Sequence, residues 1–162
     1  NRGPNLGTDV LYSGTVSAAI EAVLLGIPAI AISLDSANAK DFSPAQKAAQ
    51  NLCTLMFKEK LAPDTLLNVN VPNSPLNKIK GYKVTKLGER KYTERFEYHK
   101  DPQGKVFYRY SGQVVPPSTD DEDLDVNAVK NNYISVTPIH FDLTNYKIME
   151  QVKKWGLENL GF

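Results

Sequence analysis

The feature that most limits how this chain can fold is a small-residue segment followed directly by an apolar run. Residues 14–25 are rich in alanine and leucine, which favour a helix, and Ser13 supplies the hydroxyl of an N-cap. Gly26 and Pro28 end that helix, and the almost continuous apolar run over residues 29–34 is typical of a strand buried on both faces. A helix followed at once by such a strand predicts an α/β sheet.

The remainder of the chain also alternates between helical and extended patterns. The expected elements are a helix over residues 43–60, strands over 66–71 and 79–87, a short helix over 125–131, a strand over 133–139 and a final amphipathic helix. Ser43 is expected to cap the second helix, with Ala48, Leu52, Leu55 and Met56 along one face. These patterns support the α/β class.

Residues 88–115 have a different character, because aromatic residues alternate there with charged ones. A turn over residues 101–104 separates two such runs, so the region is predicted to be a β-hairpin that projects from the main sheet. We therefore divide the chain into two parts. Residues 1–87 form part of the α/β core, and residues 88–162 hold the hairpin, an acidic linker over 116–125 and a C-terminal strand and helix.

Charge and cysteine content narrow the classes of protein that remain. The net charge is +1, so no long-range field favours nucleic acid or an anionic membrane. Cys53 is the single cysteine, which rules out an internal disulfide and fits a reducing cytoplasm. No apolar run reaches the ~18–20 residues that a membrane-spanning helix needs. We therefore expect a cytoplasmic protein with neither nucleic acid nor membrane as a partner.

The mouth of the first helix is the first of two places that could carry chemistry. Ser13, Gly14 and Thr15 offer free main-chain amides and two hydroxyls, which together with the helix dipole suit a phosphate group. The alternative is that Ser13 only caps the helix, which is the commoner role of such a residue.

The loop before this helix is the second place, since it carries Asn1, Asn5 and Asp9. Their oxygens are hard ligands suited to Mg²⁺ or Mn²⁺, and the alternative is ordinary turn chemistry. His99 and His140 are the only histidines and neither has a cysteine or histidine partner at ligand spacing, which argues against zinc. The chain also lacks a Gly-x-Ser-x-Gly elbow and a Walker A loop.

Taken together, these residues are far more specific than any one of them. The first nineteen residues, NRGPNLGTDVLYSGTVSAA, closely resemble the signature of the SurE family (survival protein E), the metal-dependent 5′/3′-nucleotidases. Further matches follow in the same order, at residues 28–34, 67–72, 79–81, 133–140 and 142–144. The resemblance covers essentially the whole chain, and the acidic linker is its loosest part.

The resemblance implies a Rossmann-like, three-layer α/β core with a projecting hairpin and a C-terminal segment used to form homodimers or homotetramers. It also implies hydrolysis of nucleoside 5′- and 3′-monophosphates with a divalent cation, Mg²⁺ or Mn²⁺. By this resemblance Asn1 is a metal ligand, and Asn5, Ser13, Gly14 and Thr15 border the phosphate site.

One departure from the family pattern is large. The family's other metal ligands lie upstream, in an Asp-Asp-Gly motif and at a serine, and no Asp-Asp-Gly occurs here. We therefore expect this chain to be the C-terminal two thirds of a family member, without the N-terminal strands, and to be inactive alone. The alternatives are a non-catalytic phosphate- or nucleotide-binding module and an oligomerisation module.

Overall fold

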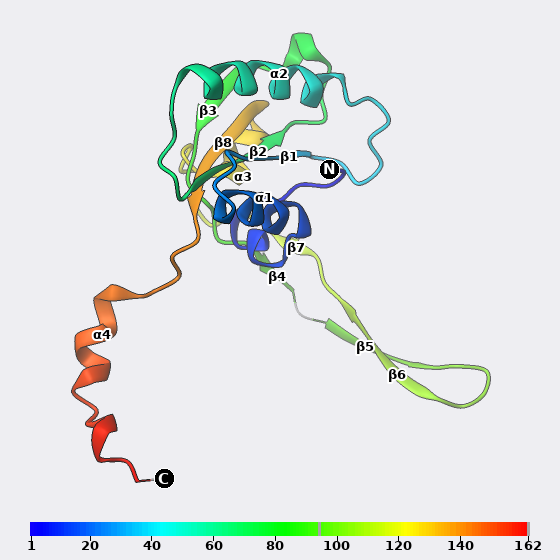
Figure 1. Ribbon diagram of the computed structural model, residues 1–162. Helices are drawn as coiled ribbons and strands as arrows, with labels where there is room; N and C mark the ends of the chain where they lie inside the picture. Colours follow the sequence, from blue (N-terminus) through cyan, green and yellow to red (C-terminus); the bar gives the residue numbers. More distant parts are fainter. Residues whose placement is uncertain (94, 162) are drawn as a thin grey trace.

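A four-stranded sheet forms the centre of the computed structural model, which describes residues 1–93 and 95–161 (Figure 1). Strand order is β1 (Ile30–Leu34), β2 (Thr65–Val71), β8 (Tyr133–His140) and β3 (Gly81–Val84). The pairs β1–β2 and β3–β8 are parallel, and β2–β8 is antiparallel. The sheet is therefore mixed, which confirms the α/β class.

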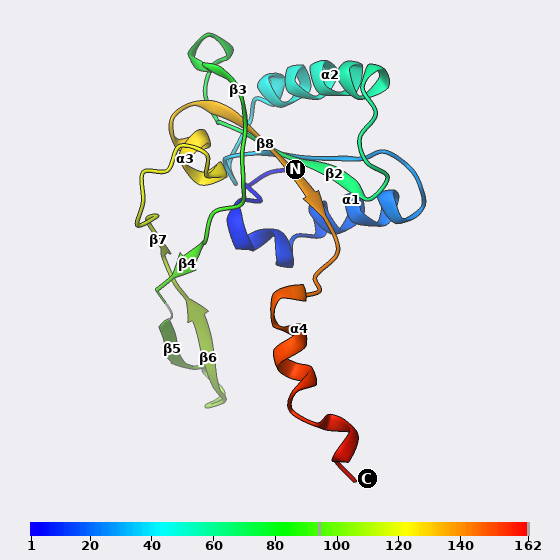
Figure 2. The same cartoon turned by 90° about the vertical axis from the view of Figure 1, so that its left-hand side faces the viewer.

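Helices cover both faces of this sheet, as Figures 1 and 2 show. The helix α2 (Ser43–Lys58) packs on one face, while α1 (Gly14–Leu24) and the short α3 (Asp125–Lys130) pack on the other. Short 3₁₀ turns occur at η1 (Gly7–Tyr12), η2 (Leu76–Lys78) and η3 (Leu157–Asn159). The predicted three-layer arrangement is thus present. No helix among the described residues is both long enough and apolar enough to cross a membrane.

The alternation of side chains along β2 separates two environments. Leu67, Val69 and Val71 face the apolar layer under α2, as strand geometry predicts. Leu66 on the opposite face joins the α1 cluster. The same face also carries Asn68 and Asn70, which are fully buried. One face of the sheet is therefore an ordinary core, and the other contains buried amides that require hydrogen-bond partners.

The expected cap of α2 is wrong in detail. The Ser43 hydroxyl does not cap the helix; its own N–H and Oγ donate to the Asp41 carboxylate, at 2.8 and 2.9 Å. Leu52 is buried, and Leu55 on the same side of the helix is 53% exposed, because it lines an open groove between α2 and β3 with Tyr82 and Val84. The strand expected over residues 79–87 is also shorter: β3 is Gly81–Val84, and Thr85 N adds one bond to Val136 O of β8 at 3.0 Å.

The predicted hairpin is present and projects from the sheet (Figure 1). It consists of β5 (Arg95–Lys100) and β6 (Val106–Ser111), with β4 (Lys91–Tyr92) and β7 (Val114–Val115) paired at its base. The final helix α4 (Tyr146–Lys153) also extends away from the sheet (Figure 2). The acidic linker is anchored by two ion pairs, Lys83–Glu122 at 2.8 Å and Lys86–Asp121 at 2.7 Å.

Candidate active site

The first residues of the chain lie along the carboxyl end of β1. The main-chain nitrogen of Asn1 donates to Ile32 O at 2.9 Å, and Leu34 N donates to Asn1 O at 3.0 Å. Gly3 N continues the pairing by donating to Ser36 O at 3.1 Å. In open α/β sheets, ligands bind outside the carboxyl ends of the strands. The loop that was expected to carry a ligand is therefore at the appropriate end of the sheet.

The side chain of Asn1 is exposed at this end. Its amide nitrogen donates to Gly3 O at 2.9 Å, so the carboxamide oxygen is the atom left for a ligand. A hard oxygen of this kind suits Mg²⁺ or Mn²⁺, but Mg²⁺ needs six ligands. Residues 1–93 and 95–161 contain no group of three or more His, Cys, Asp or Glu side chains that could hold a metal. The Asn1 oxygen fits such a cation, but the described residues do not supply the other ligands of a metal site.

Asp35 is a further carboxylate at the same end of the sheet. It follows β1 directly, and its N–H donates to Val71 O at 2.8 Å. Burial raises the pKa of Asp35 above its usual range, and the Arg90 guanidinium partly opposes this effect. No local sequence pattern marks Asp35, because only the fold places it in a desolvated position.

Asn5 lies over the buried polar face of the sheet. Its main-chain N–H donates to Asn70 Oδ1 at 2.8 Å, and its carbonyl accepts from Asn68 and Asn70 Nδ2 at 2.8 and 2.9 Å. Its side-chain amide donates to Ser33 Oγ at 2.5 Å. The two strand asparagines therefore hold the loop on the sheet. The two asparagines in an otherwise apolar strand were the available sequence signal for this contact.

Ser13 caps α1 as predicted. Its Oγ accepts the N–H of Val16 at 3.0 Å, and its side chain is buried. In the described part of the chain, the amides of Gly14 and Thr15 have no acceptor, as is usual in the first turn of a helix. The structure thus confirms the cap and leaves two donors at the helix mouth. No hydrogen bond between described residues joins Ser13 to Asn1 or Asn5; η1 connects them along the chain.

Loss of this cap gives a first measurable expectation. Ser13→Ala should lower the free energy of unfolding by about 1 kcal/mol, because the Val16 N–H loses its partner. Ser17→Ala is the matched control, since Ser17 is exposed on the same helix and the change should stay within about 0.5 kcal/mol. Urea denaturation measures both variants. Equal effects would contradict a capping role.

A buried carboxylate connects η1 to the base of the hairpin. Asp125 is fully buried and accepts hydrogen bonds from the N–H groups of Gly7, Gly88 and Val126, at 2.6, 2.9 and 2.8 Å. Burial raises the pKa of Asp125, against the opposing effect of these three N–H groups and of Arg90. From the sequence, Asp125 was expected only to begin a short helix. Its contacts hold three separate segments of the chain together.

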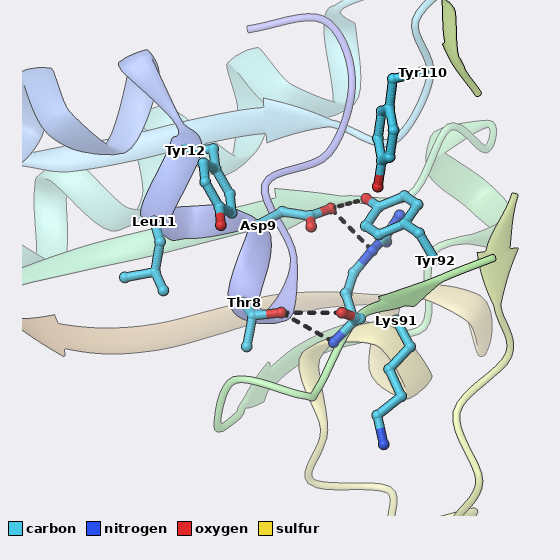
Figure 3. Close-up of a pocket in the computed structure, with 8 residues that line it drawn as sticks. Thr8, Asp9, Leu11, Tyr12, Lys91, Tyr92 and Tyr110 are labelled. Atoms are coloured by element: carbon cyan, nitrogen blue, oxygen red, sulfur yellow. Dashed lines mark hydrogen bonds and ion pairs between the residues drawn. The ribbon is translucent and has the colours of Figure 1, made fainter. Parts of the chain in front are cut away.

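A cavity of about 860 Å³ opens between η1 and the hairpin base (Figure 3). Asp9 and Tyr12 line it from η1, Arg90 and Tyr92 from the segment that includes β4, and Tyr110 from β6. Asp9 Oδ2 pairs with Arg90 Nε at 3.0 Å and accepts a short hydrogen bond from the Tyr92 hydroxyl. Burial is the main cause that raises the pKa of Tyr92, and the bond to Asp9 adds to it. These contacts connect Asp9 to the base of the hairpin through Arg90 and Tyr92.

Known proteins share the sequence that forms this site. A model of the family described as survival protein SurE matches residues 1–94, which include η1, α1, α2 and the Asn1–Thr15 site residues. The chain belongs to the SurE family. This confirms the resemblance that the first nineteen residues suggested.

Individual SurE relatives extend the match to nearly the whole chain. It is 54% identical to the 5′-nucleotidase SurE of Pelotomaculum thermopropionicum, covering 95% of this chain and 58% of the relative. It is 49% identical to the 5′-nucleotidase SurE of Heliobacterium modesticaldum, covering 96% and 57%. The solved structure of the SurE protein from Aquifex aeolicus has a TM-score of 0.82 and 44% identity, over 96% of this chain and 62% of that one. The chain thus spans about three fifths of the length of these SurE proteins.

Proposed function

We propose that the full-length protein is a divalent-metal-dependent phosphomonoesterase that hydrolyses nucleoside 5′- and 3′-monophosphates to nucleoside and phosphate. The main support is the geometry at the carboxyl end of β1, where the Asn1 loop leads through η1 to the open mouth of α1. Membership of a family whose relatives are named 5′-nucleotidases supports the substrate class. We place this activity in the cytoplasm.

Each candidate residue has a separate task in this proposal. The free amides of Gly14 and Thr15, supported by the helix dipole, bind the phosphate oxygens. Ser13 holds the first turn in place through its bond to Val16 N. Asn5 keeps the loop on the sheet beside the phosphate.

The metal has one candidate ligand in this chain, the carboxamide oxygen of Asn1. The family pattern assigns the remaining ligands to an upstream Asp-Asp-Gly motif and to an upstream serine, and the 162 residues contain no Asp-Asp-Gly. When bound, Mg²⁺ or Mn²⁺ supplies positive charge that polarises the phosphoryl group. Because the 162 residues supply only this one candidate ligand, we propose that they are inactive alone.

The metal assignment can be tested with the full-length protein, including whatever residues precede Asn1. Asn1→Ala should raise the Mn²⁺ concentration needed for half-maximal hydrolysis of adenosine 5′-monophosphate by roughly tenfold, because one oxygen ligand is lost. Asn77→Ala is the control, since Asn77 is exposed on η2. Unchanged Mn²⁺ dependence of the Asn1 variant would remove Asn1 from the metal site.

A non-catalytic phosphate- or nucleotide-binding module is the second candidate, because the described residues supply only part of a metal site. This second function predicts that the full-length protein still binds nucleotide in EDTA. It also predicts no hydrolysis when Mn²⁺ is restored. The same titration therefore separates the two functions.

Assembly is a further part of the proposal. The hairpin and α4 expose many large apolar side chains, including Tyr108 on β6 and Ile148 and Met149 on α4. Aromatic and apolar residues of this kind are enriched in protein interfaces. We propose that they join copies of the chain into a homodimer or homotetramer.

A further inference from the structure

We propose that the cavity between η1 and the hairpin base binds the nucleoside part of the substrate, with Tyr12 and Tyr110 against the base and Asp9 on a ribose hydroxyl. This inference rests on the proposed function, because it assigns the half of that substrate which the helix mouth does not contact.

The position of the cavity is the first argument. Tyr12 directly precedes Ser13, so its Cα lies only ~3.8 Å along the chain from the cap of the phosphate-binding helix mouth. Ser13, Gly14 and Thr15 do not line the cavity themselves, but Tyr12 connects it to them directly along the chain. A substrate whose phosphate is held at Gly14 and Thr15 can therefore extend its nucleoside towards the cavity. The volume of about 860 Å³ is within the range of sites for small molecules.

The aromatic lining is the second argument. Tyr12 is 90% exposed and Tyr110 is 58% exposed, so neither ring contributes to a core. Figure 3 shows Tyr12 and Tyr110 on opposite sides of Asp9, with Tyr92 beside it. Tyrosine rings stack on any nucleobase through their π faces, and their hydroxyls remain available for hydrogen bonds.

The charge balance of the cavity favours a neutral nucleoside over a second phosphate. Arg90 is neutralised by Asp9, and Lys91 pairs with Glu89 at 3.1 Å. Arg90 and Tyr92 contact Asp9 Oδ2, whereas Oδ1 accepts no hydrogen bond from the residues that the structure describes. A carboxylate oxygen of this kind accepts a ribose hydroxyl in dinucleotide-binding folds.

The test compares two substrates of the full-length protein that differ in the base. Tyr12→Ala and Tyr110→Ala should each lower kcat/KM for adenosine 5′-monophosphate by roughly tenfold, mainly through KM, because base stacking is lost. Hydrolysis of ribose 5-phosphate, which has no base, should stay within about twofold, and this also verifies folding. Tyr12→Phe should retain activity because it keeps the ring.

Tyr98→Ala provides the matched control, because Tyr98 is 59% exposed on the same hairpin but does not line the cavity. It should leave both substrates unchanged. Equal losses on both substrates, or no loss from either cavity variant, would overturn the subsite while leaving the nucleotidase proposal intact.

Binding of adenosine separates this inference from failure of the proposed function. Equilibrium dialysis should show that the wild-type protein binds adenosine and that Tyr12→Ala weakens this binding by roughly tenfold. If the wild-type protein hydrolyses no phosphate ester but binds adenosine in this manner, the function is wrong and the subsite stands. Absence of adenosine binding to the wild-type protein would overturn the subsite.

Discussion

Gly7→Ala is expected to lower the free energy of unfolding by roughly 4 kcal/mol, through left-handed strain and overpacking. Gly7 has a φ of +54°, a backbone conformation that residues other than glycine rarely adopt. A Cβ at this position would lie 2.2 Å from Gly88 O and 2.9 Å from Arg90 Cγ. Because the first obstacle is main chain, one of the two segments must move.

Gly3→Ala is the control for this prediction. Gly3 also has a positive φ, +83°, but an added Cβ would meet nothing within 4 Å. It should cost only about 1–2 kcal/mol, which is the left-handed strain alone. Urea denaturation measures the difference between the two variants. Similar losses would mean that the approach of η1 to Gly88 does not matter for stability.

Gly7→Ala should also affect the candidate site. Gly7 begins η1, which leads from the Asn5 loop to Ser13 and lines the cavity with Asp9 and Tyr12. A shift at Gly7 therefore moves the cavity wall relative to the hairpin base. In the full-length protein, we expect Gly7→Ala to lower the proposed nucleotidase activity even in molecules that remain folded.

Asp125→Ala should lower the free energy of unfolding by about 3–5 kcal/mol, because it leaves buried N–H groups without an acceptor. The affected donors belong to Gly7, Gly88 and Val126. Asp125→Asn should cost less, since one amide oxygen can still accept from Gly88 and Val126 while the amide nitrogen cannot accept from Gly7.

An exposed carboxylate nearby serves as the comparison. Asp123→Ala should change stability by no more than about 0.5 kcal/mol, because the Asp123 side chain is exposed. Thermal and urea unfolding of Asp125→Ala, Asp125→Asn and Asp123→Ala rank the three losses of stability. A loss for Asp125→Ala as small as that of Asp123→Ala would show that the three N–H groups find other partners.

Most elements could be predicted because their signals act over a few residues. The Ser13 hydroxyl reaches Val16 N, and Gly26 takes the positive φ of +77° that ends α1. The prediction that Ser43 caps α2 was wrong for a related reason. Ser43 and Asp41 are both good capping residues, and only the backbone geometry decides which side chain accepts a main-chain N–H. Periodicity placed Leu52 and Leu55 on one face, but it does not say how closely β3 packs there, which leaves Leu55 half exposed.

The candidate site also combines features that the sequence predicts with contacts that only the fold decides. By itself the sequence determined the helix mouth, the family and the candidate residues, since these depend on residue types at short spacing. Only the tertiary structure decided that Asn5 binds Asn68 and that Gly7 binds Asp125, across 63 and 118 residues of chain. A buried polar group must find a partner, but its own position does not say which one. That choice depends on which segments the packed sheet brings together.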